Sequence, residues 1–172
     1  MANSTTRIEY QGHVTIKVVS GNKILKSAKC HNAGTSWFSK LIASSVLGNN
    51  EAVNMPKFLD AGTSVTTQGV TTYTSCLSSR VQLTGKQLKK DTVSDSKAWI
   101  ASFTAVLPRK SITVSGDSIT INTLKVYPTS TGGDENLLAS VDLTDDNKIS
   151  VLATSESSII VVWNMKFITS AD

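Results

Sequence analysis

Histidine and cysteine side chains are the first candidates for metal binding or nucleophilic chemistry, and the 172-residue chain has two of each. His13 lies in an alternating apolar segment, and His31 lies just before a predicted helix. A zinc centre needs three or four converging ligands, usually with Cys-x-x-Cys or His-x-x-x-His spacing, and the sequence contains neither spacing. Cys30 and Cys76 lie in unlike contexts, which favours free buried thiols over the alternative of a disulfide. We therefore expect no metal centre.

Three short segments resemble catalytic or ion-binding motifs. Residues 94–97 match Ser-x-x-Lys, but the companion motifs of that enzyme class are absent from the sequence. Residues 84–86 resemble the end of a phosphate-binding loop, but Arg80 occupies the place of its first glycine. Residues 142–147 are acidic but lack the glycine and closing glutamate of an EF-hand.

The acidic residues at 134–135 and 145–146 are ordinary turn residues in one interpretation, and ligands of a surface calcium in the alternative one. We expect no catalytic residue, no cofactor, and a protein that is not an enzyme.

A basic cluster lies in the middle of the chain and consists of Arg80, Lys86, Lys89, Lys90 and Lys97. Binding of single-stranded nucleic acid normally requires aromatic side chains between such charges. Only Trp99 is near, and it lies in an apolar strand pattern. We therefore expect no specific nucleic-acid binding, and non-specific contact with nucleic acid within an assembly is the alternative.

Charge is unevenly distributed along the chain. Residues 1–110 hold 14 Lys and Arg against five Asp and Glu, which gives +9; residues 111–172 hold three against eight, which gives −5 and the total of +4. The split either reflects chance surface decoration or indicates that a positive surface of one copy contacts a negative surface of another. The second possibility predicts an assembly interface that contains Arg80, Lys86, Lys89, Lys90, Asp142, Asp145 and Asp146.

The composition favours a single all-β domain over residues 1–172, with residues 1–6 flexible. Serine and threonine make up about a quarter of the chain, which is well above the usual proportion. Threonine favours strands, and serine favours turns and strand ends. No apolar run is long enough to span a membrane, and the N-terminus lacks the apolar core of a signal peptide. We therefore expect synthesis in a cytoplasm and no membrane association.

Alternation of apolar and polar residues predicts about eight strands. The clearest are an opening hairpin at 9–19 and 24–30, a strand at 98–107, and a closing strand at 159–167. Further hairpins are predicted at 112–114 with 119–127, interrupted by a bulge near Asn122, and at 148–153 with 159–167. We expect Trp99, Phe103, Trp163, Met165 and Leu41 in the core.

Two other segments depart from this strand pattern. Apolar residues spaced by three and four predict one substantial α-helix over 35–47, with Thr35 or Asn32 as its N-cap. Residues 62–79 have few large apolar side chains and indicate a long Thr/Ser-rich excursion that a partner would order. Together the patterns predict an antiparallel, jelly-roll-like β-sandwich with one helix.

The order of segments resembles that of small β-sandwich structural proteins in tailed-bacteriophage virions. The resemblance is carried by the opening hairpin, residues 31–35 leading into the helix, residues 56–60, the strand that ends at Leu107, residues 124–127 and 138–143, and the strand centred on Trp163. It implies a neck, tail or capsid-accessory subunit without catalytic residues. Such a subunit would be made in the host bacterial cytoplasm, reside in the virion, and contact copies of itself and other virion structural proteins.

A carbohydrate- or receptor-binding β-sandwich module of a phage fibre or adhesin is the alternative. Such a module requires aromatic side chains exposed in loops, because sugar rings stack on them. Tyr73, within the 62–79 segment, is the best candidate for that role.

Overall fold

The computed structural model describes residues 6–34, 55–91 and 97–171, and this part of the chain is mostly β-structure. Its strands are β1 (Thr6–Ser20), β2 (Lys23–Gly34), β3 (Phe58–Thr67), β4 (Val70–Ser75), β5 (Val81–Gln82), β6 (Thr84–Lys90), β7 (Lys97–Leu107), β8 (Ser118–Ile121), β9 (Thr123–Tyr127), β10 (Ala139–Asp142), β11 (Ile149–Leu152) and β12 (Ser158–Ala171). Three single 3-10 turns complete it: η2 (Arg109–Ser111), η3 (Asp134–Asn136) and η4 (Asp145–Asn147). The helix predicted over 35–47, with Leu41, lies outside the described residues.

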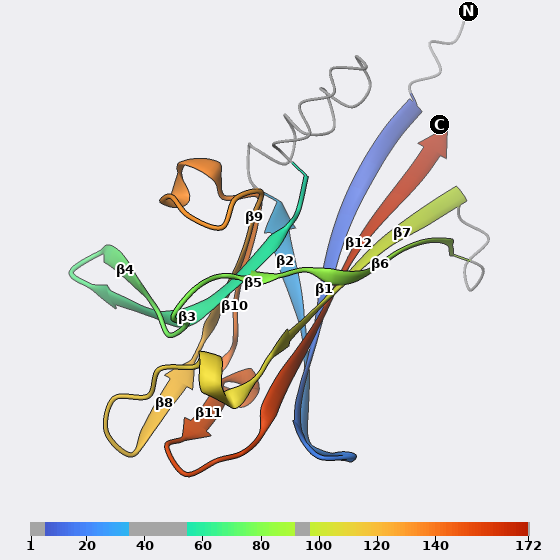
Figure 1. Ribbon diagram of the computed structural model, residues 1–172. Coiled ribbons are helices and arrows are strands. Elements are labelled where there is room, and N and C mark those ends of the chain that lie inside the picture. The colour runs from blue at the N-terminus through green and yellow to red at the C-terminus, as the bar shows by residue number, and fades with distance from the viewer. Residues whose placement is uncertain (1–5, 35–54, 92–96, 172) are drawn as a thin grey trace, which may run out of the picture.

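One large antiparallel sheet has two halves (Figure 1). One half has the order β6-β7-β12-β1-β2, and the other has the order β10-β9-β3, with β4 and β5 both paired to β3. β2 belongs to both halves, because residues 23–32 pair with β1 and residues 33–34 pair with β10. On the other side, β5 pairs with β3 and the following strand, β6, pairs with β7. One connection between the halves is therefore the single strand β2, and the other is made by β5 and β6, which only Leu83 separates.

The apolar face of the closing strand lies in the core, as the sequence predicts. Trp163 is fully buried and Met165 is nearly so, and both belong to a cluster that also contains Leu59 and Leu124 from the opposite half. The prediction for Trp99 is wrong, because its side chain is 49 % exposed. Figure 1 shows β7 extending past the opposite half of the sheet. On the same strand face, Ala105 and Leu107 are fully buried further along β7.

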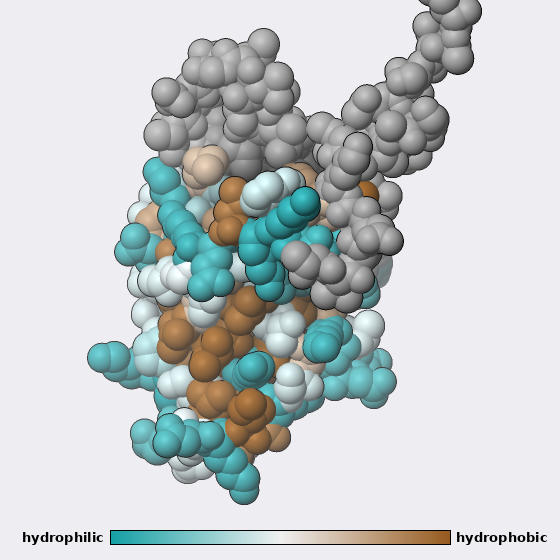
Figure 2. Space-filling view, turned by 90° about the vertical axis from the view of Figure 1, so that its right-hand side faces the viewer, coloured by the Kyte–Doolittle hydropathy of each residue, from teal (hydrophilic) through white to brown (hydrophobic). Residues whose placement is uncertain are grey.

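The outer face of β7 and β12 is apolar near the C-terminal end of β7, where it pairs with the N-terminal end of β12. Val106 lies opposite Ile160 in the β7–β12 register, and Val162 lies opposite Thr104. The Val106 side chain is 45 % exposed, and Ile160 and Val162 are half-buried. Figure 2 looks at this side of the molecule and shows apolar side chains gathered between hydrophilic ones. We call Val106, Ile160 and Val162 the outer apolar patch.

Two of the predicted hairpins are wrong in their pairing. β8 pairs with β11 in a separate two-stranded sheet, whereas β12 pairs with β1 and β7. Ile112 forms only an isolated bridge, to Leu77. The strand pattern does break near Asn122, but the break separates β8 from β9, which belong to different sheets, and is not the predicted bulge within a hairpin. The side-chain amide of Asn122 accepts from the Ser64 N–H (2.7 Å) and donates to the Ser64 carbonyl (2.8 Å). Asn122 therefore bonds to β3 through its side chain, at the residue where the chain passes from the small sheet to the large one.

The excursion predicted over 62–79 is largely a regular hairpin. β3 and β4 pair in register from Gly62 with Ser75 to Thr67 with Val70. The two-residue turn between them has positive φ at Gln68 (52°) and Gly69 (79°), as a type I′ turn requires. Among the described residues, no helix is long and apolar enough to cross a membrane.

Candidate functional site

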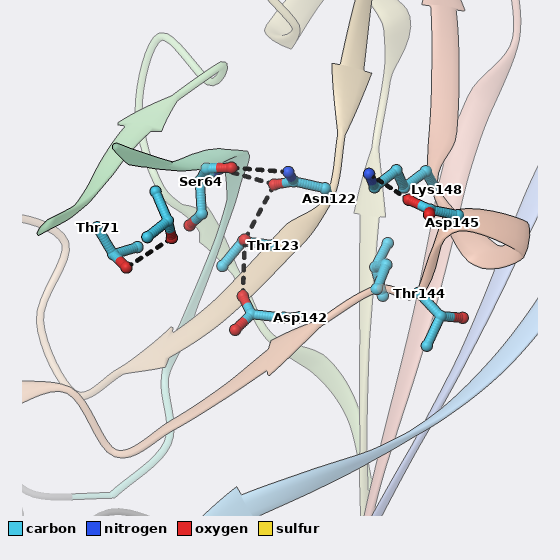
Figure 3. Close-up of a pocket in the computed structure, with 10 residues that line it drawn as sticks. Ser64, Thr71, Asn122, Thr123, Asp142, Thr144, Asp145 and Lys148 are labelled. Atoms are coloured by element: carbon cyan, nitrogen blue, oxygen red, sulfur yellow. Dashed lines mark hydrogen bonds and ion pairs between the residues drawn. The ribbon is translucent and has the colours of Figure 1, made fainter. Parts of the chain in front are cut away.

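A polar groove lies between the β3–β4 hairpin and the loop after β10 (Figure 3). Its cavity volume is about 510 Å3. The lining side chains are mainly hydroxyls, amides and carboxylates: Ser64, Thr66, Thr71, Asn122, Thr123, Leu143, Thr144, Asp142, Asp145 and Lys148. The groove can therefore offer hydrogen-bond donors and acceptors to a polar ligand.

Contacts among the lining residues hold many of these groups in place. Thr66 and Thr71 share a hydrogen bond between their hydroxyls at 2.8 Å, which links the two strands of the hairpin. The Thr123 hydroxyl donates to Asp142 at 2.8 Å. Lys148 Nζ lies 2.6 Å from Asp145 Oδ1, and this hydrogen bond, followed by the lysine charge, lowers the pKa of Asp145.

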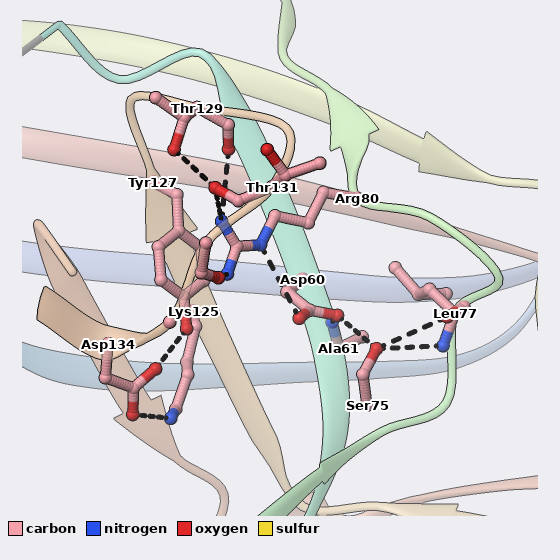
Figure 4. Close-up of polar contacts among 12 residues, drawn as sticks. Asp60, Ala61, Ser75, Leu77, Arg80, Lys125, Tyr127, Thr129, Thr131 and Asp134 are labelled. Carbon is pink, nitrogen blue, oxygen red and sulfur yellow. Dashed lines mark hydrogen bonds and ion pairs between the residues drawn. The ribbon is translucent and has the colours of Figure 1, made fainter. Parts of the chain in front are cut away.

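Arg80 lies at the centre of a second polar cluster (Figure 4). Its guanidinium donates to the carbonyls of Thr129 (3.2 Å), Thr131 (3.1 Å) and Gly132 (2.5 Å). It also lies 3.4 Å above the centroid of the Tyr127 ring. Its side chain is only 10 % exposed. Arg80 therefore ties the loop after β9 to the body of the protein.

Asp60 supplies the negative charge nearest to Arg80. Their Oδ2 and Nε atoms are 3.8 Å apart. Asp60 also accepts hydrogen bonds from the Ala61 N–H (2.9 Å) and the Ser75 hydroxyl (2.6 Å). Since Asp60 is buried, these partners replace the water that its carboxylate would otherwise contact.

Lys125 and Asp134 form the other charged pair of this cluster. The Lys125 ammonium and the Tyr127 hydroxyl both donate to the Asp134 carboxylate. Burial alone would raise the pKa of Asp134, but these hydrogen bonds hold it below its usual value. Burial, and then the bond to Asp134, raise the pKa of Tyr127. We call the set Asp60, Arg80, Lys125, Tyr127 and Asp134 the loop clasp, because its groups bond mainly to one another and to the loop.

The structure separates the residues of the predicted assembly interface into three locations. Lys86, Lys89 and Lys90 are exposed on β6, at one edge of the sheet. Asp142, Asp145 and Asp146 are exposed near the groove. Arg80 does not fit a surface interface, because its guanidinium is nearly buried in the loop clasp. One feature of the sequence distinguishes Arg80 from the three lysines. Arg80 follows a long uncharged stretch, because no charged residue lies between Asp60 and Arg80.

The two histidines meet on the outer face of the sheet. His13 of β1 pairs with His31 of β2, and their ring centroids are 4.6 Å apart. Burial, then the charges of His31 and Lys166, lower the pKa of His13. Asn164 is the cross-strand neighbour of His13 on the other side, and its Oδ1 accepts from Ser102 at 2.6 Å. Within the described residues, no group of three or more His, Cys, Asp or Glu side chains is placed to hold a metal ion.

Both cysteines are free thiols, which confirms the prediction from their contexts. Cys76 is buried, and its thiol donates to the Ala61 carbonyl at 3.0 Å. Burial, followed by the charge of Asp60, raises the pKa of Cys76 to about 11. Burial also raises the pKa of Cys30. A raised pKa keeps both thiols protonated at neutral pH, which makes them poor nucleophiles.

Tyr73 does not match the exposed aromatic side chain that a sugar-binding loop requires. The Lys125 ammonium lies 4.0 Å from the centroid of its ring, so the lysine occupies a ring face. Burial, followed by the charge of Asp60, raises the pKa of the Tyr73 hydroxyl.

Comparisons with known families, proteins and structures identify no relative of this chain. No family model matches the chain, and no curated protein or solved structure matches it significantly. The described residues form an antiparallel, all-β fold.

Proposed function

We propose that this protein is a non-enzymatic structural subunit of a tailed-phage virion, assembled in multiple copies in the neck, the tail or a capsid-accessory layer. In this proposal the two halves of the sheet are the layers of a β-sandwich. The sharing of one core cluster by residues of both halves supports that arrangement. The order of sequence segments described above supports the virion role.

The observation that carries the multi-copy role is the outer apolar patch. A sheet face that belongs to a monomer in water normally carries polar side chains, so three adjacent aliphatic ones favour contact with another surface. Lys17 lies opposite Ile160 in the β1–β12 register, beside the patch. An apolar centre with a charged margin is the usual anatomy of a protein–protein interface.

The virion role is tested by looking for the chain in purified phage particles. Particles from a host that carries the gene would be banded by density and probed by quantitative mass spectrometry. We expect several copies of this chain per particle, at a ratio to the major capsid protein that is constant between preparations. Absence of the chain from intact, infectious particles would refute the proposal.

The role of the patch is tested with two lysine substitutions. Val106→Lys places a charge in the patch, and Leu152→Lys places one at a somewhat more exposed apolar residue on β11 (54 % against 45 %). We expect the first substitution to reduce incorporation into particles and the second to leave it unchanged. Equal incorporation of both variants would show that the patch is not a contact surface.

A polar-ligand module is the second candidate function, and the groove is the observation that favours it. Its hydroxyl and carboxylate lining suits a glycan, which would bind through hydrogen bonds, since Tyr73 is engaged by Lys125. A glycan array tested with the wild-type protein and with Asp142→Ala decides this candidate. Binding that the substitution abolishes supports it, and no binding to any glycan removes it.

A further inference from the structure

The two edges of the large sheet differ in how they are protected against pairing with other strands. The edge strand β6 has the sequence Thr-Gly-Lys-Gln-Leu-Lys-Lys, with three lysines in seven residues. Its register against β7 is irregular between Thr84 and Gln87, and Gly85 has a φ of 57°. Lysines and bulges are the features that prevent edge-to-edge association of β-sheets.

The edge strand β4 has none of these features. Its sequence is Val-Thr-Thr-Tyr-Thr-Ser, and its pairing with β3 is regular throughout. Five of its six residues are exposed, and Val70 is 68 % exposed. β-branched and aromatic residues without charge, proline or bulge favour the addition of a further strand.

The register of the β3–β4 pair identifies the backbone N–H and C=O groups of β4 that can bond to a further strand. The Cys76 N–H donates to the Ala61 carbonyl, which makes this a hydrogen-bonded pair. Hydrogen-bonded and non-hydrogen-bonded pairs alternate along an antiparallel ladder. Thr74 and Thr72 therefore bond to β3, whereas Thr71 and Tyr73 direct their N–H and C=O groups away from it. Among the described strands, β4 is terminal in the sheet order, so none of them pairs with these groups.

We propose that β4 pairs antiparallel with β4 of a second copy of this chain, so that the sheet continues from one copy into the next. The inference rests on the proposed multi-copy role and names one contact within it. A second copy is favoured as the occupant because the hairpin is uncharged: no Asp, Glu, Lys or Arg lies between Asp60 and Arg80. A two-fold contact pairs a strand with an identical strand, so a strand whose charges have a single sign, such as β6, would face like charges, whereas an uncharged strand carries no such penalty.

This contact is distinct from the predicted contact between opposite charges. The lysines of β6 and the aspartates near the groove lie on different parts of the surface, and such a pair of surfaces joins copies head to tail. The β4 contact is a two-fold contact of one strand with itself. A subunit that has one contact of each kind can form a larger assembly than either contact gives alone.

The test compares substitutions on the two edges. Thr71→Pro removes an outward N–H without removing a backbone hydrogen bond to β3, although the hydroxyl bond between Thr71 and Thr66 is lost with it. Thr72→Lys gives β4 a lysine of the kind that β6 carries. Leu88→Lys is the matched control, because Leu88 is 69 % exposed on β6. Self-association of the full chain would be measured by sedimentation velocity from low to high micromolar concentration.

We expect both β4 substitutions to weaken self-association by about tenfold or more, because each occurs twice in a two-fold contact. The control should associate as the wild type does. Association that Thr71→Pro and Thr72→Lys leave unchanged would overturn the β4 contact while leaving the virion role intact, because that role is judged by the particle composition. A wild-type chain that is monomeric at every concentration would also overturn it.

Amide hydrogen exchange gives a second measurement that does not depend on any variant. On raising the concentration of wild-type protein, exchange at Thr71 and Tyr73 should slow, while Thr72 and Thr74 should be protected at every concentration. This alternating pattern is specific to strand pairing. Uniform slowing of all four amides, or no change at Thr71 and Tyr73, would contradict the proposal.

Discussion

Replacement of Arg80 by methionine should destabilise the protein strongly, although Arg80 lies outside the main apolar core. Methionine keeps most of the side-chain volume over the Tyr127 ring. The substitution therefore removes mainly the hydrogen bonds and the ion pair of the guanidinium. The guanidinium donates to three loop carbonyls and faces the buried Asp60 carboxylate. Removing one partner of a buried ion pair costs about 3–5 kcal/mol in stability. Asp60 keeps its bonds from Ala61 and Ser75, which places the expected loss near the lower end, at about 3 kcal/mol.

The measurement is urea unfolding of the wild type, Arg80→Met, Asp60→Asn and the double variant. Lys86→Met is the control, because an exposed lysine contributes within about 0.5 kcal/mol. If Arg80 and Asp60 stabilise each other, the double variant should be more stable than the sum of the single losses predicts, by about 1–3 kcal/mol. A loss below about 1 kcal/mol in Arg80→Met would refute the assignment of a structural clasp. Strict additivity would show that Arg80 acts through the loop carbonyls and not through Asp60.

Four further outcomes are expected. Trp163→Ala should cost about 3–5 kcal/mol of unfolding free energy, because the side chain is fully buried; an unchanged melting temperature would contradict this. Replacing Cys30 and Cys76 together by alanine should leave unfolding insensitive to reductant, as in the wild type, and a reductant effect on the wild type would disprove free thiols. The folded-state pKa of Asp134 is lowered, so its contribution is present above its usual pKa and is lost as pH falls through the folded value. Asp134→Asn should therefore flatten the acid limb of a stability–pH curve, and an unaltered limb would count against the clasp. Asn122→Ala should remove two side-chain hydrogen bonds between β3 and the β8–β9 junction and lower the unfolding midpoint in urea by more than the exposed control does.

The sequence predicts individual strands better than it predicts their partners. The closing strand is recognisable because apolar residues alternate up to Phe167, and its core face is buried as expected. Pairing is a different question, since alternation assigns the faces of a strand but does not say which strand lies beside it. The short turn between β1 and β2 fixes that pairing locally. β8 and β11 are separated by more than twenty residues, and nothing local indicates that they pair.

The loop clasp also has a sequence signal, although its geometry could not be predicted. Asp60 and Lys125 each interrupt a short apolar run, Phe58–Ala61 in β3 and Leu124–Val126 in β9, and a charged residue at such a place is usually buried with a partner. In the sheet these two residues are direct cross-strand neighbours. Their main partners, Arg80 and Asp134, lie in other segments, so the contacts depend on the tertiary fold. The prediction for Trp99 failed for a related reason, because the length of β7 beyond the covered region is a property of the whole fold.

The charge split along the sequence overstates the charge that is available for contact with another copy. Arg80 and Lys125 count toward opposite portions of the chain, yet both are nearly buried and paired within the loop clasp. Lys166 is paired with Asp91 at 2.7 Å, and Lys148 with Asp145. What remains is more local: the three lysines of β6, and an acidic group near the groove in which Asp146 has no ion pair among the described residues. The lysines of β6 protect that edge from strand pairing and could attract a negative surface, whereas the uncharged β4 lacks this protection and is open to strand pairing. The same distribution of charge thus assigns different kinds of contact to the two edges of one sheet.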